Sequence, residues 1–531
     1  MRIKLSGQIA AIAGLMLGIG VAWAEPVVTL TSLDGATQLE GELLSFDGKT
    51  YILRTGVGTI NVEAAQVTCA GDGCPGQAAN SAQPADTSQP AGTGQFSIAG
   101  SNIIGDRLMP ALVEGYADQL EAELVREVGA GGNESVFRLN DGATNEIVAI
   151  NVGAHGTATA FASLSEGTAA IGLASRRMHG PEAGLADLRD SPHEQILALD
   201  GLIVIVHPDN PIRTMSLDQI AGVFSGRITN WAALGGPDQP ISVYVPDDRS
   251  GTLEVFETTV MQPRQLGIID TAERLEDHAD LSDLVSVDPT GIGLTGFAYA
   301  RGSRMLAIRQ ECGLISFPTS FAMKTEEYPL GRRLYAYGSG QTPLPVHARG
   351  LLDFALTDAA QPIVADAGFV DRDIEGQGIE VQGARLAHSL TSPEEFSLPV
   401  FREMLAEIKD AERLSITFRF TLGSSNLETR SQSEAERFAQ LLAGGAYPGK
   451  DILLVGFTDS VGEFAVNRNL AVRRAQSVLD TLKHSVDAGA LDAVPILVQS
   501  YGELTPVGCN ETNAGRELNR RVEVWVRDKR S

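Results

Sequence analysis

Residues 452–482 read ILLVGFTDSVGEFAVNRNLAVRRAQSVLDTL and decide the fold of the C-terminal part of the chain. The apolar run 452–457 predicts a buried strand, because short apolar runs bounded by turn residues are typical of such strands. The residues at 458–460, Thr-Asp-Ser, form a polar turn after it. The residues beyond this turn have the spacing of a helix, so the sequence predicts a strand-turn-helix unit.

One face of this predicted helix carries a charge. Val466, Leu470 and Val478 are separated by multiples of four residues and would form one apolar stripe. Arg474 lies in the same stripe, where a charge must be paired or must contact a ligand. Asp459, at the end of the strand, is the expected partner. The sequence therefore predicts an acid and a base presented together where the strand meets the helix.

The C-terminal segment resembles the OmpA-type domain that binds peptidoglycan, over residues 412–529. The resemblance rests on Thr458, Asp459, Gly462, Asn467, Leu470, Arg474, Ala475, Gly502, Pro506, Asn510, Gly515, Arg516, Asn519, Arg520 and Arg521. It implies that Asp459 and Arg474 clamp the ammonium and carboxylate of a stem-peptide diamino acid, with Asn467 and Arg520 in the same site. Ala471 replaces the usual Ser, which can remove one hydrogen bond but not the clamp. A purely structural Asp–Arg pair is the alternative.

The composition limits the domain count and the partners. The 531 residues suffice for about three or four domains of ~150 residues each, and 43% hydrophobic residues can form sizeable cores. The formal net charge of -26 argues against binding to nucleic acid or to acidic lipid surfaces. An anion site is compatible with this charge, because helix dipoles and arginines can dominate locally.

Residues 1–24 are expected to be a signal peptide. Arg2 and Lys4 precede the apolar run 9–21, and the sequence Ala-Trp-Ala at 22–24 matches a cleavage site, with cleavage expected after Ala24. The apolar run is too short to predict a membrane span. We therefore expect an exported protein, periplasmic and associated with the cell wall or outer membrane.

Four cysteines fit an oxidising compartment. Cys69 and Cys74, in CAGDGC, are close enough to predict a small disulfide loop. A metal site is disfavoured because a second pair of ligands is missing. Cys312 and Cys509 lie in different predicted domains, where they could be free buried thiols or a bridge between domains; the sequence leaves both alternatives open.

The order of strands, helices and polar segments predicts a multidomain α/β protein. Residues 25–75 read as short strands separated by Gly and Asp turns, which predicts a small β-module. Residues 76–94 form a flexible linker rich in Ala, Gln, Pro, Ser and Gly. Residues 95–375 alternate strands with helices, as α/β layered folds do. A second linker is expected at 376–411, before the C-terminal domain at 412–531.

Three predicted helix starts in the middle domain could hold an anion. They contain Ser101 with Asn102, Gly156 with Thr157, and the run Arg249, Ser250, Gly251, Thr252. Unpaired backbone N–H groups and the helix dipole attract anions at such places. A single start of this kind is usually an ordinary helix cap. Three in one domain, with Arg176 and Arg177 after the strand AIGLAS, predict one converging site.

The middle domain is similar to the phosphate-type periplasmic binding proteins, which have the two-lobed type II fold. The similarity covers most of 95–375 and rests on FSIAGSNIIGDRLMPAL, GTATAFASLSEGTAAIGLASRRM, VIVHPDNPI, IAGVFSGRITNWAALGG, DDRSGT and EEYPLGRRLYAY. It implies that two lobes close on an oxyanion. The implied anion-binding residues are Ser101, Asn102, Thr157, Ser175, Ser250, Gly251 and Thr252, with residues 154–156 in a supporting loop.

Two departures put the choice of phosphate over sulfate in doubt. Arg176 stands where the family has an Asp that accepts a proton from the ligand, and an Arg would donate instead. Pro246 stands near the position expected for an arginine and cannot serve as one. Arg249 or Arg176 would then supply the positive charge, so both are included in the predicted anion site.

The motifs G-x-S-x-G, HExxH and the P-loop are absent from the sequence, so neither an enzyme nor a cofactor is predicted. We expect a wall-attached solute-binding protein with an OmpA-like C-terminal α/β sandwich. Its expected partners are peptidoglycan, inorganic phosphate or a similar oxyanion, and an ABC transporter or envelope protein. The alternatives are an envelope structural protein whose solute-binding fold no longer binds an anion, and a phosphate-ester hydrolase.

Overall fold

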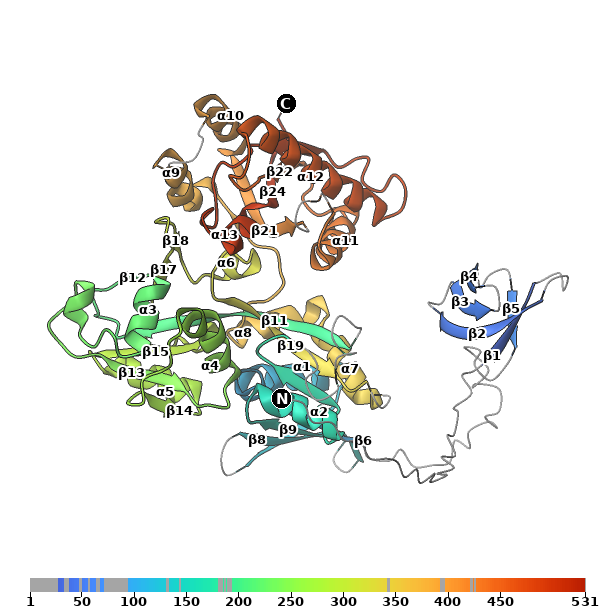
Figure 1. Ribbon diagram of the computed structural model, residues 1–531. Coiled ribbons are helices and arrows are strands. Elements are labelled where there is room, and N and C mark those ends of the chain that lie inside the picture. Colours follow the sequence, from blue (N-terminus) through green and yellow to red (C-terminus); the bar gives the residue numbers. More distant parts are fainter. Residues whose placement is uncertain are drawn as a thin grey trace, which may run out of the picture. The chain divides into compact units, whose positions relative to one another are not determined.

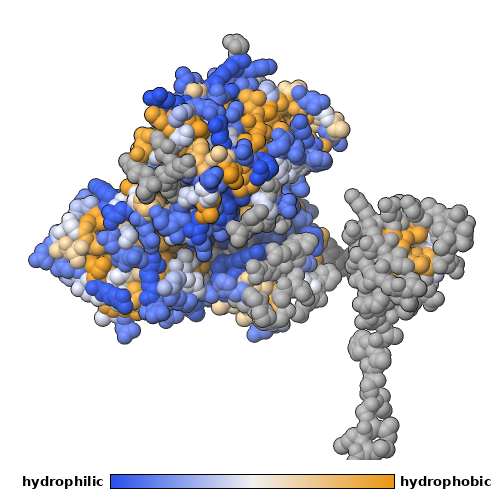
Figure 2. Space-filling view, turned by 45° about the horizontal axis from the view of Figure 1, so that its top comes forward, coloured by the Kyte–Doolittle hydropathy of each residue, from blue (hydrophilic) through white to orange (hydrophobic). Residues whose placement is uncertain are grey.

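The computed structural model describes residues 27–32, 38–46, 50–55, 58–63, 67–70, 94–129, 133–142, 145–179, 185, 188, 193–340, 344–391, 397–420, 424 and 426–530. The chain divides into two compact units, Met1–Pro90 and Ala91–Ser531 (Figure 1). The predicted signal peptide and residues 76–93 of the predicted linker lie outside the described residues. Among the described helices, none has the length and apolar character needed to cross a membrane. Hydrophilic residues cover most of the visible face of the second unit (Figure 2).

The first unit is a five-stranded antiparallel sheet. Its strands are β1 (Val27–Ser32), β2 (Gln38–Phe46), β3 (Thr50–Thr55), β4 (Gly58–Glu63) and β5 (Val67–Ala70), in the order β4-β3-β2-β1-β5. Val28, Leu30, Tyr51 and Leu53 form its small core. Cys69 in β5 is disulfide-bonded. The expected partner, Cys74, lies outside the described residues.

The second unit begins with a two-lobed α/β architecture, and we call residues 94–200 together with 331–370 the first lobe. Its leading part contains β6 (Gly94–Gly100), η3 (Ile104–Leu108), α1 (Met109–Gln119), β7 (Glu123–Val128), β8 (Glu134–Asp141), β9 (Asn145–Ala154), α2 (Thr157–Glu166) and β10 (Ile171–Ala174). The returning part contains β19 (Gly331–Gly338), α7 (Val346–Ala355), η10 (Asp358–Ala360) and α8 (Gln361–Asp366). Apolar residues from both parts share one core.

Residues 201–330 form the second lobe, with a separate core. Its elements are β12 (Thr214–Met215), α3 (Leu217–Phe224), β13 (Ser242–Pro246), α4 (Gly251–Phe256), η7 (Glu257–Met261), β14 (Glu273–Leu275), α5 (His278–Val287), β15 (Gly291–Gly296), β16 (Arg304–Met305), β17 (Ala307–Arg309), β18 (Ile315–Ser316) and α6 (Ser320–Lys324). Strand β11 (Glu194–Val206) joins the lobes, because residues 194–201 pair with β19 and residues 202–206 pair with β15. The main path of the sheet runs β14-β13-β15-β11-β19-β10-β6-β9-β8-β7.

The C-terminal domain, residues 376–530, has a five-stranded sheet with helices on both faces. Its elements are β20 (Gly376–Gln377), α9 (Gly383–Thr391), α10 (Leu398–Ile408), β21 (Ala411–Arg419), α11 (Thr429–Ala443), β22 (Lys450–Gly456), α12 (Phe464–His484), β23 (Ile496–Ser500), α13 (Asn513–Asn519) and β24 (Arg521–Asp528), with the strand order β20-β21-β24-β22-β23. Ile452 and Leu454 pack into one core and Leu453 and Val455 into the other. Successive side chains of a strand point to opposite faces, so burial of both explains the unbroken apolar run.

The segment expected to be a linker, 376–411, is folded instead. Val400, Phe401, Met404 and Ile408 of α10 pack into the second core of the C-terminal domain, with Trp525 of β24. This correction has a simple cause, because the apolar residues of α10 recur at helical spacing and cover one face of the sheet.

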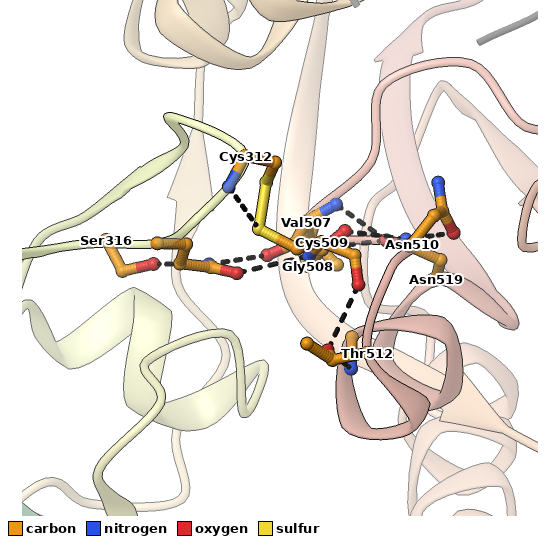
Figure 3. Close-up of a disulfide and its surroundings, with 10 residues drawn as sticks. Cys312, Ser316, Val507, Gly508, Cys509, Asn510, Thr512 and Asn519 are labelled. Atoms are coloured by element: carbon orange, nitrogen blue, oxygen red, sulfur yellow. Dashed lines mark hydrogen bonds between the residues drawn. A yellow bond between two sulfur atoms is a disulfide. The ribbon is translucent and has the colours of Figure 1, made fainter. Parts of the chain in front are cut away.

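The structure also decides between the two alternatives for the remaining cysteines. Cys312, in the loop between β17 and β18, forms a disulfide with Cys509, which is 197 residues away in sequence and lies in the C-terminal domain (Figure 3). The two-lobed part and the C-terminal domain are therefore covalently joined at a second point.

Candidate functional site

Three hydroxyl groups of the first lobe lie together where its central strands end. Strands β6 and β10 are parallel neighbours, so Ser101 and Ser175 both follow the carboxyl ends of adjacent strands. Their Oγ atoms are 2.5 Å apart. The Ser175 backbone N–H donates to Oγ1 of Thr157, at the start of α2, over 3.0 Å. The structure thus brings together three of the predicted anion-binding residues, all of them buried.

The second lobe adds the start of α4 to this hydroxyl cluster. Ser250 caps the helix, because its side chain accepts a hydrogen bond from the Thr252 backbone N–H over 3.2 Å. A Cβ atom at Gly251 would lie only 2.3 Å from Thr157 Oγ1, so a glycine is needed for this close approach. The two lobes therefore touch at the predicted site.

Thr252 has an unused hydroxyl in this cluster. Its side chain is 1% exposed, and its Oγ1 atom has no hydrogen-bond partner among the described residues. A buried hydroxyl without a partner is costly. Asn102, also buried, opens the helical segment that follows Ser101. The arrangement offers hydroxyl and amide groups from both lobes to a small oxyanion.

The two predicted arginines occupy different surroundings. The Arg176 side chain is only 8% exposed, and its Nε donates to Glu254 Oε2 over 2.7 Å. The Arg249 side chain is 55% exposed and pairs with Asp247 and Glu276 at the surface. Its charge is thus offset by two carboxylates, which argues against Arg249 as the cation of the site.

Two acidic residues near the meeting of the lobes were not singled out from the sequence. Glu254 lies in the first turn of α4, where the sequence pattern predicts a helix start but gives Glu254 no role of its own. Asp106, in η3, comes close to carboxylates of the second lobe. Burial, together with the negative charges of Asp277 and Glu276, raises the pKa of Asp106 to about 7. The fold brings Asp106 near Asp277 and Glu276, so no local sequence pattern predicts that these carboxyl groups interact.

The predicted peptidoglycan site lies between β22 and α12, where strand meets helix. Asp459 accepts a hydrogen bond from Arg520 Nη1 over 2.9 Å, and both side chains are nearly buried. Asn467 Nδ2 donates to the Asp459 backbone carbonyl over 3.2 Å and to Glu503 Oε2 over 2.8 Å. Glu503 was not predicted, and its burial beside Asn467 adds a second acid to this region.

Arg474 is buried in the same region but has a different partner from the one expected. Its Nε donates to the Ser424 carbonyl over 3.3 Å, and its guanidinium lies 5.4 Å from the centre of the Phe420 ring. Asp459 forms its ion pair with Arg520 instead.

Nη1 of Arg474 is buried and has no hydrogen-bond partner among the described residues. Burial and the charge of Arg520 lower the pKa of Arg474 to about 10, whereas the charge of Asp459 acts in the opposite direction. Arg474 thus keeps a buried N–H donor that a ligand carboxylate would accept from.

The apolar stripe predicted for α12 needs one correction. Val466 is 57% exposed, whereas Phe464, Asn467, Ala471, Ala475, Val478 and Leu482 are buried together with Arg474. The buried face is therefore shifted by one residue at the start of the helix, and it presents Asn467 as well as Arg474 to the site.

Comparisons with known proteins follow this division of the chain. Residues 142–359 match the PBP superfamily domain, and residues 419–520 match the OmpA family. The phosphate-binding protein PstS of Bacillus subtilis is 28% identical over 225 residues, which are 42% of this chain and 70% of that relative. Protein SphX of Synechococcus elongatus is 26% identical over 261 residues, covering 46% of this chain and 77% of the relative.

The C-terminal domain has its own relative. The outer membrane porin F of Pseudomonas aeruginosa is 34% identical over 121 residues, which are 22% of this chain and 33% of that protein. The chain therefore contains a PBP superfamily domain similar to phosphate-binding proteins, followed by a C-terminal domain of the OmpA family.

Proposed function

We propose that the protein is an exported, wall-attached solute-binding protein that captures a small oxyanion, such as phosphate, between its two lobes. The observation that carries this proposal is the buried hydroxyl cluster, to which both lobes contribute. Within the part of the chain that the structure describes, Thr252 Oγ1 in this cluster has no hydrogen-bond partner. A bound oxyanion would accept hydrogen bonds from these groups. The similarity to named phosphate-binding proteins supports the same ligand class.

The second half of the proposal concerns the cell wall. The C-terminal domain would bind peptidoglycan, with Arg474 Nη1 donating to a ligand carboxylate and Asp459 contacting an ammonium group. The buried Nη1 of Arg474, which has no hydrogen-bond partner among the described residues, supports the first contact. Location in the periplasm near the wall follows from both halves of the proposal. Capture, storage or sensing of the anion there would each suit a tethered receptor.

The anion proposal is tested by calorimetric titration of the full chain with phosphate and then sulfate, after carried-over anion is removed by partial unfolding and dialysis. Micromolar or tighter binding of one anion is expected. The absence of heat with both anions would contradict the proposal and favour an envelope structural protein. The neutralisation of Arg176 by Glu254 is the observation that favours this second candidate.

Substitution of Thr252 by valine is expected to weaken anion binding. The change removes one hydroxyl donor to a charged partner, worth ~1.5–3 kcal/mol, or about 10- to 150-fold in affinity. Thr258→Val is the matched control, since Thr258 lies on the adjoining helical turn and donates to backbone carbonyls there. Equal affinities for the Thr252 variant and the wild type would remove Thr252 from the site.

A further inference from the structure

An ion pair connects the two lobes beside the hydroxyl cluster. Arg176 directly follows Ser175 in the first lobe, and Glu254 lies two residues after Thr252 in the second lobe. The guanidinium Nε and the carboxylate Oε2 are 2.7 Å apart. Since each partner belongs to a different lobe, the pair can exist only while the lobes are together.

The guanidinium of Arg176 is held in place by its own lobe. It lies 5.1 Å from the centre of the Phe161 ring, and its Nη1 donates to the Arg177 backbone carbonyl over 3.1 Å. The side chain of Arg176 is 8% exposed and that of Glu254 is 38% exposed. A partly buried pair is screened less by solvent than a fully exposed one, and the contacts within the first lobe position the Arg176 guanidinium for Glu254.

We propose that Arg176 and Glu254 form a latch that holds the lobes closed over the anion, which makes Arg176 a positioning residue instead of an anion ligand. This inference rests on the proposed anion binding. Breaking the pair would mainly speed the opening of the lobes and the release of the anion. The anion itself would be held by hydroxyl and backbone N–H groups.

The test compares Glu254→Gln, Arg176→Gln and the exchanged pair Arg176→Glu with Glu254→Arg in the full chain. Stopped-flow release of phosphate or sulfate should be about 3- to 10-fold faster in each single variant, the range for a partly exposed pair. The exchanged pair should recover most of the wild-type rate. Tighter binding in Glu254→Gln would show that the freed Arg176 contacts the anion, and would overturn the latch.

A second readout separates the latch from the anion proposal. The distance between labels on the two lobes, measured without added anion, should shift towards open conformations in Glu254→Gln and return in the exchanged pair. If the wild type binds neither anion but this shift occurs, the ion pair still holds the lobes together, and the proposed anion binding alone fails. An unchanged distance distribution in Glu254→Gln overturns the latch.

A different set of contacts fixes the C-terminal domain to one lobe. The disulfide joins Cys509 to Cys312 of the second lobe (Figure 3). The side chain of Gln310 adds two hydrogen bonds beside it. Gln310 accepts a hydrogen bond from the Cys509 backbone N–H over 3.2 Å and donates to the Val507 carbonyl over 3.3 Å. The disulfide and the two hydrogen bonds of Gln310 thus join the second lobe to the C-terminal domain at one place.

Buried charges extend this interface beyond the disulfide. Arg413 of β21 is 1% exposed, its Nη1 donates to Glu327 Oε2 of the second lobe over 3.1 Å, and its guanidinium lies 5.4 Å from the Phe321 ring. Arg419 Nη2 donates to the Thr325 carbonyl over 2.7 Å. On the side of the first lobe, Arg437 lies 3.7 Å from Asp358, whose side chain is 82% exposed, and such a pair contributes little.

We infer that the second lobe and the C-terminal domain move as one rigid body, so that the first lobe alone moves when the anion site opens. A receptor held at the wall by its C-terminal domain would therefore present a stationary second lobe and a mobile first lobe. The contacts between the second lobe and the C-terminal domain carry this inference, so it is independent of which ligand the anion site binds.

Distances between labels on exposed residues test this arrangement in the full chain. Labels introduced as non-natural amino acids at Asp118 in the first lobe, Asp270 in the second lobe and Gln476 in the C-terminal domain leave the cysteines intact. The Asp270–Gln476 distribution should be narrow and should stay unchanged on addition of phosphate. The Asp118–Gln476 distribution should be broader without added anion. An Asp270–Gln476 distribution as broad as the Asp118–Gln476 one would overturn the inference, whether or not phosphate binds.

Discussion

Replacement of Arg474 by alanine should abolish sedimentation of the protein with purified peptidoglycan. The guanidinium is buried, its Nη1 has no hydrogen-bond partner in the described part of the chain, and Asp459 is paired with Arg520. A ligand carboxylate would therefore be held mainly by Arg474. Loss of one partner of a desolvated charge pair costs about 2–5 kcal/mol, which corresponds to at least about 30-fold in affinity.

Arg473→Ala is the matched control for this experiment, because Arg473 is the preceding residue of the same helix and its side chain is exposed. It should sediment as the wild type does. Asp459→Ala should behave like Arg474→Ala, since it removes the acid and leaves Arg520 unpaired. Circular dichroism and anion binding by the two lobes would show that each variant is folded. Full sedimentation of folded Arg474→Ala would contradict peptidoglycan binding at this site.

Loss of the disulfide, by replacing Cys312 and Cys509 with serine, should have the largest effect on stability. The bridge closes a loop of 197 residues, and the chain-entropy model gives up to about 5 kcal/mol for loops of this size. The buried ion pairs between the domains would then have to hold the interface alone. The expected result is separate unfolding of the two-lobed part and the C-terminal domain at lower denaturant concentration.

Two tryptophans make this separation measurable. Trp231 is buried in the second lobe and Trp525 in the C-terminal domain, so Trp231→Phe and Trp525→Phe backgrounds report on one part each. The wild type should show one shared transition, and the serine variant should show two. Replacement of Cys69 and Cys74 by serine is the control and should leave both signals unchanged. Coincident, unshifted transitions in the variant without Cys312 and Cys509 would contradict the expected role.

The sequence predicted strands, turns and helices better than it predicted which side chains form ion pairs. The run 452–457 lies in and directly after strand β22, and the polar turn is followed by helix α12. The helix starts at Ser101 and Thr157 lie at one edge of the sheet, because β6 is parallel to both β9 and β10, whereas the start at Ser250 reaches them from the second lobe. Arg474 is the cation nearest to Asp459 in the sequence motif, yet Asp459 pairs with Arg520, which lies 61 residues further along the chain at the end of α13.

Other features depended on contacts that no local pattern contains. The segment 376–411 was predicted to be a linker, but α10 has an apolar face that packs on one face of the sheet, with Trp525 of β24. Val466 was predicted to lie on the buried face of α12 but is exposed, whereas Asn467 is buried. The pairing of Cys312 with Cys509 required the relative placement of two domains, which spacing in sequence does not give.

The disulfide also changes what a protease can do to this chain. Residues 312–509 form a covalent ring that contains the returning strand of the first lobe, β19, and most of the C-terminal domain. A single cut between residues 313 and 508 would open this ring without releasing either part. The two-lobed part and the C-terminal domain would stay attached until the bridge was reduced or the chain was cut a second time.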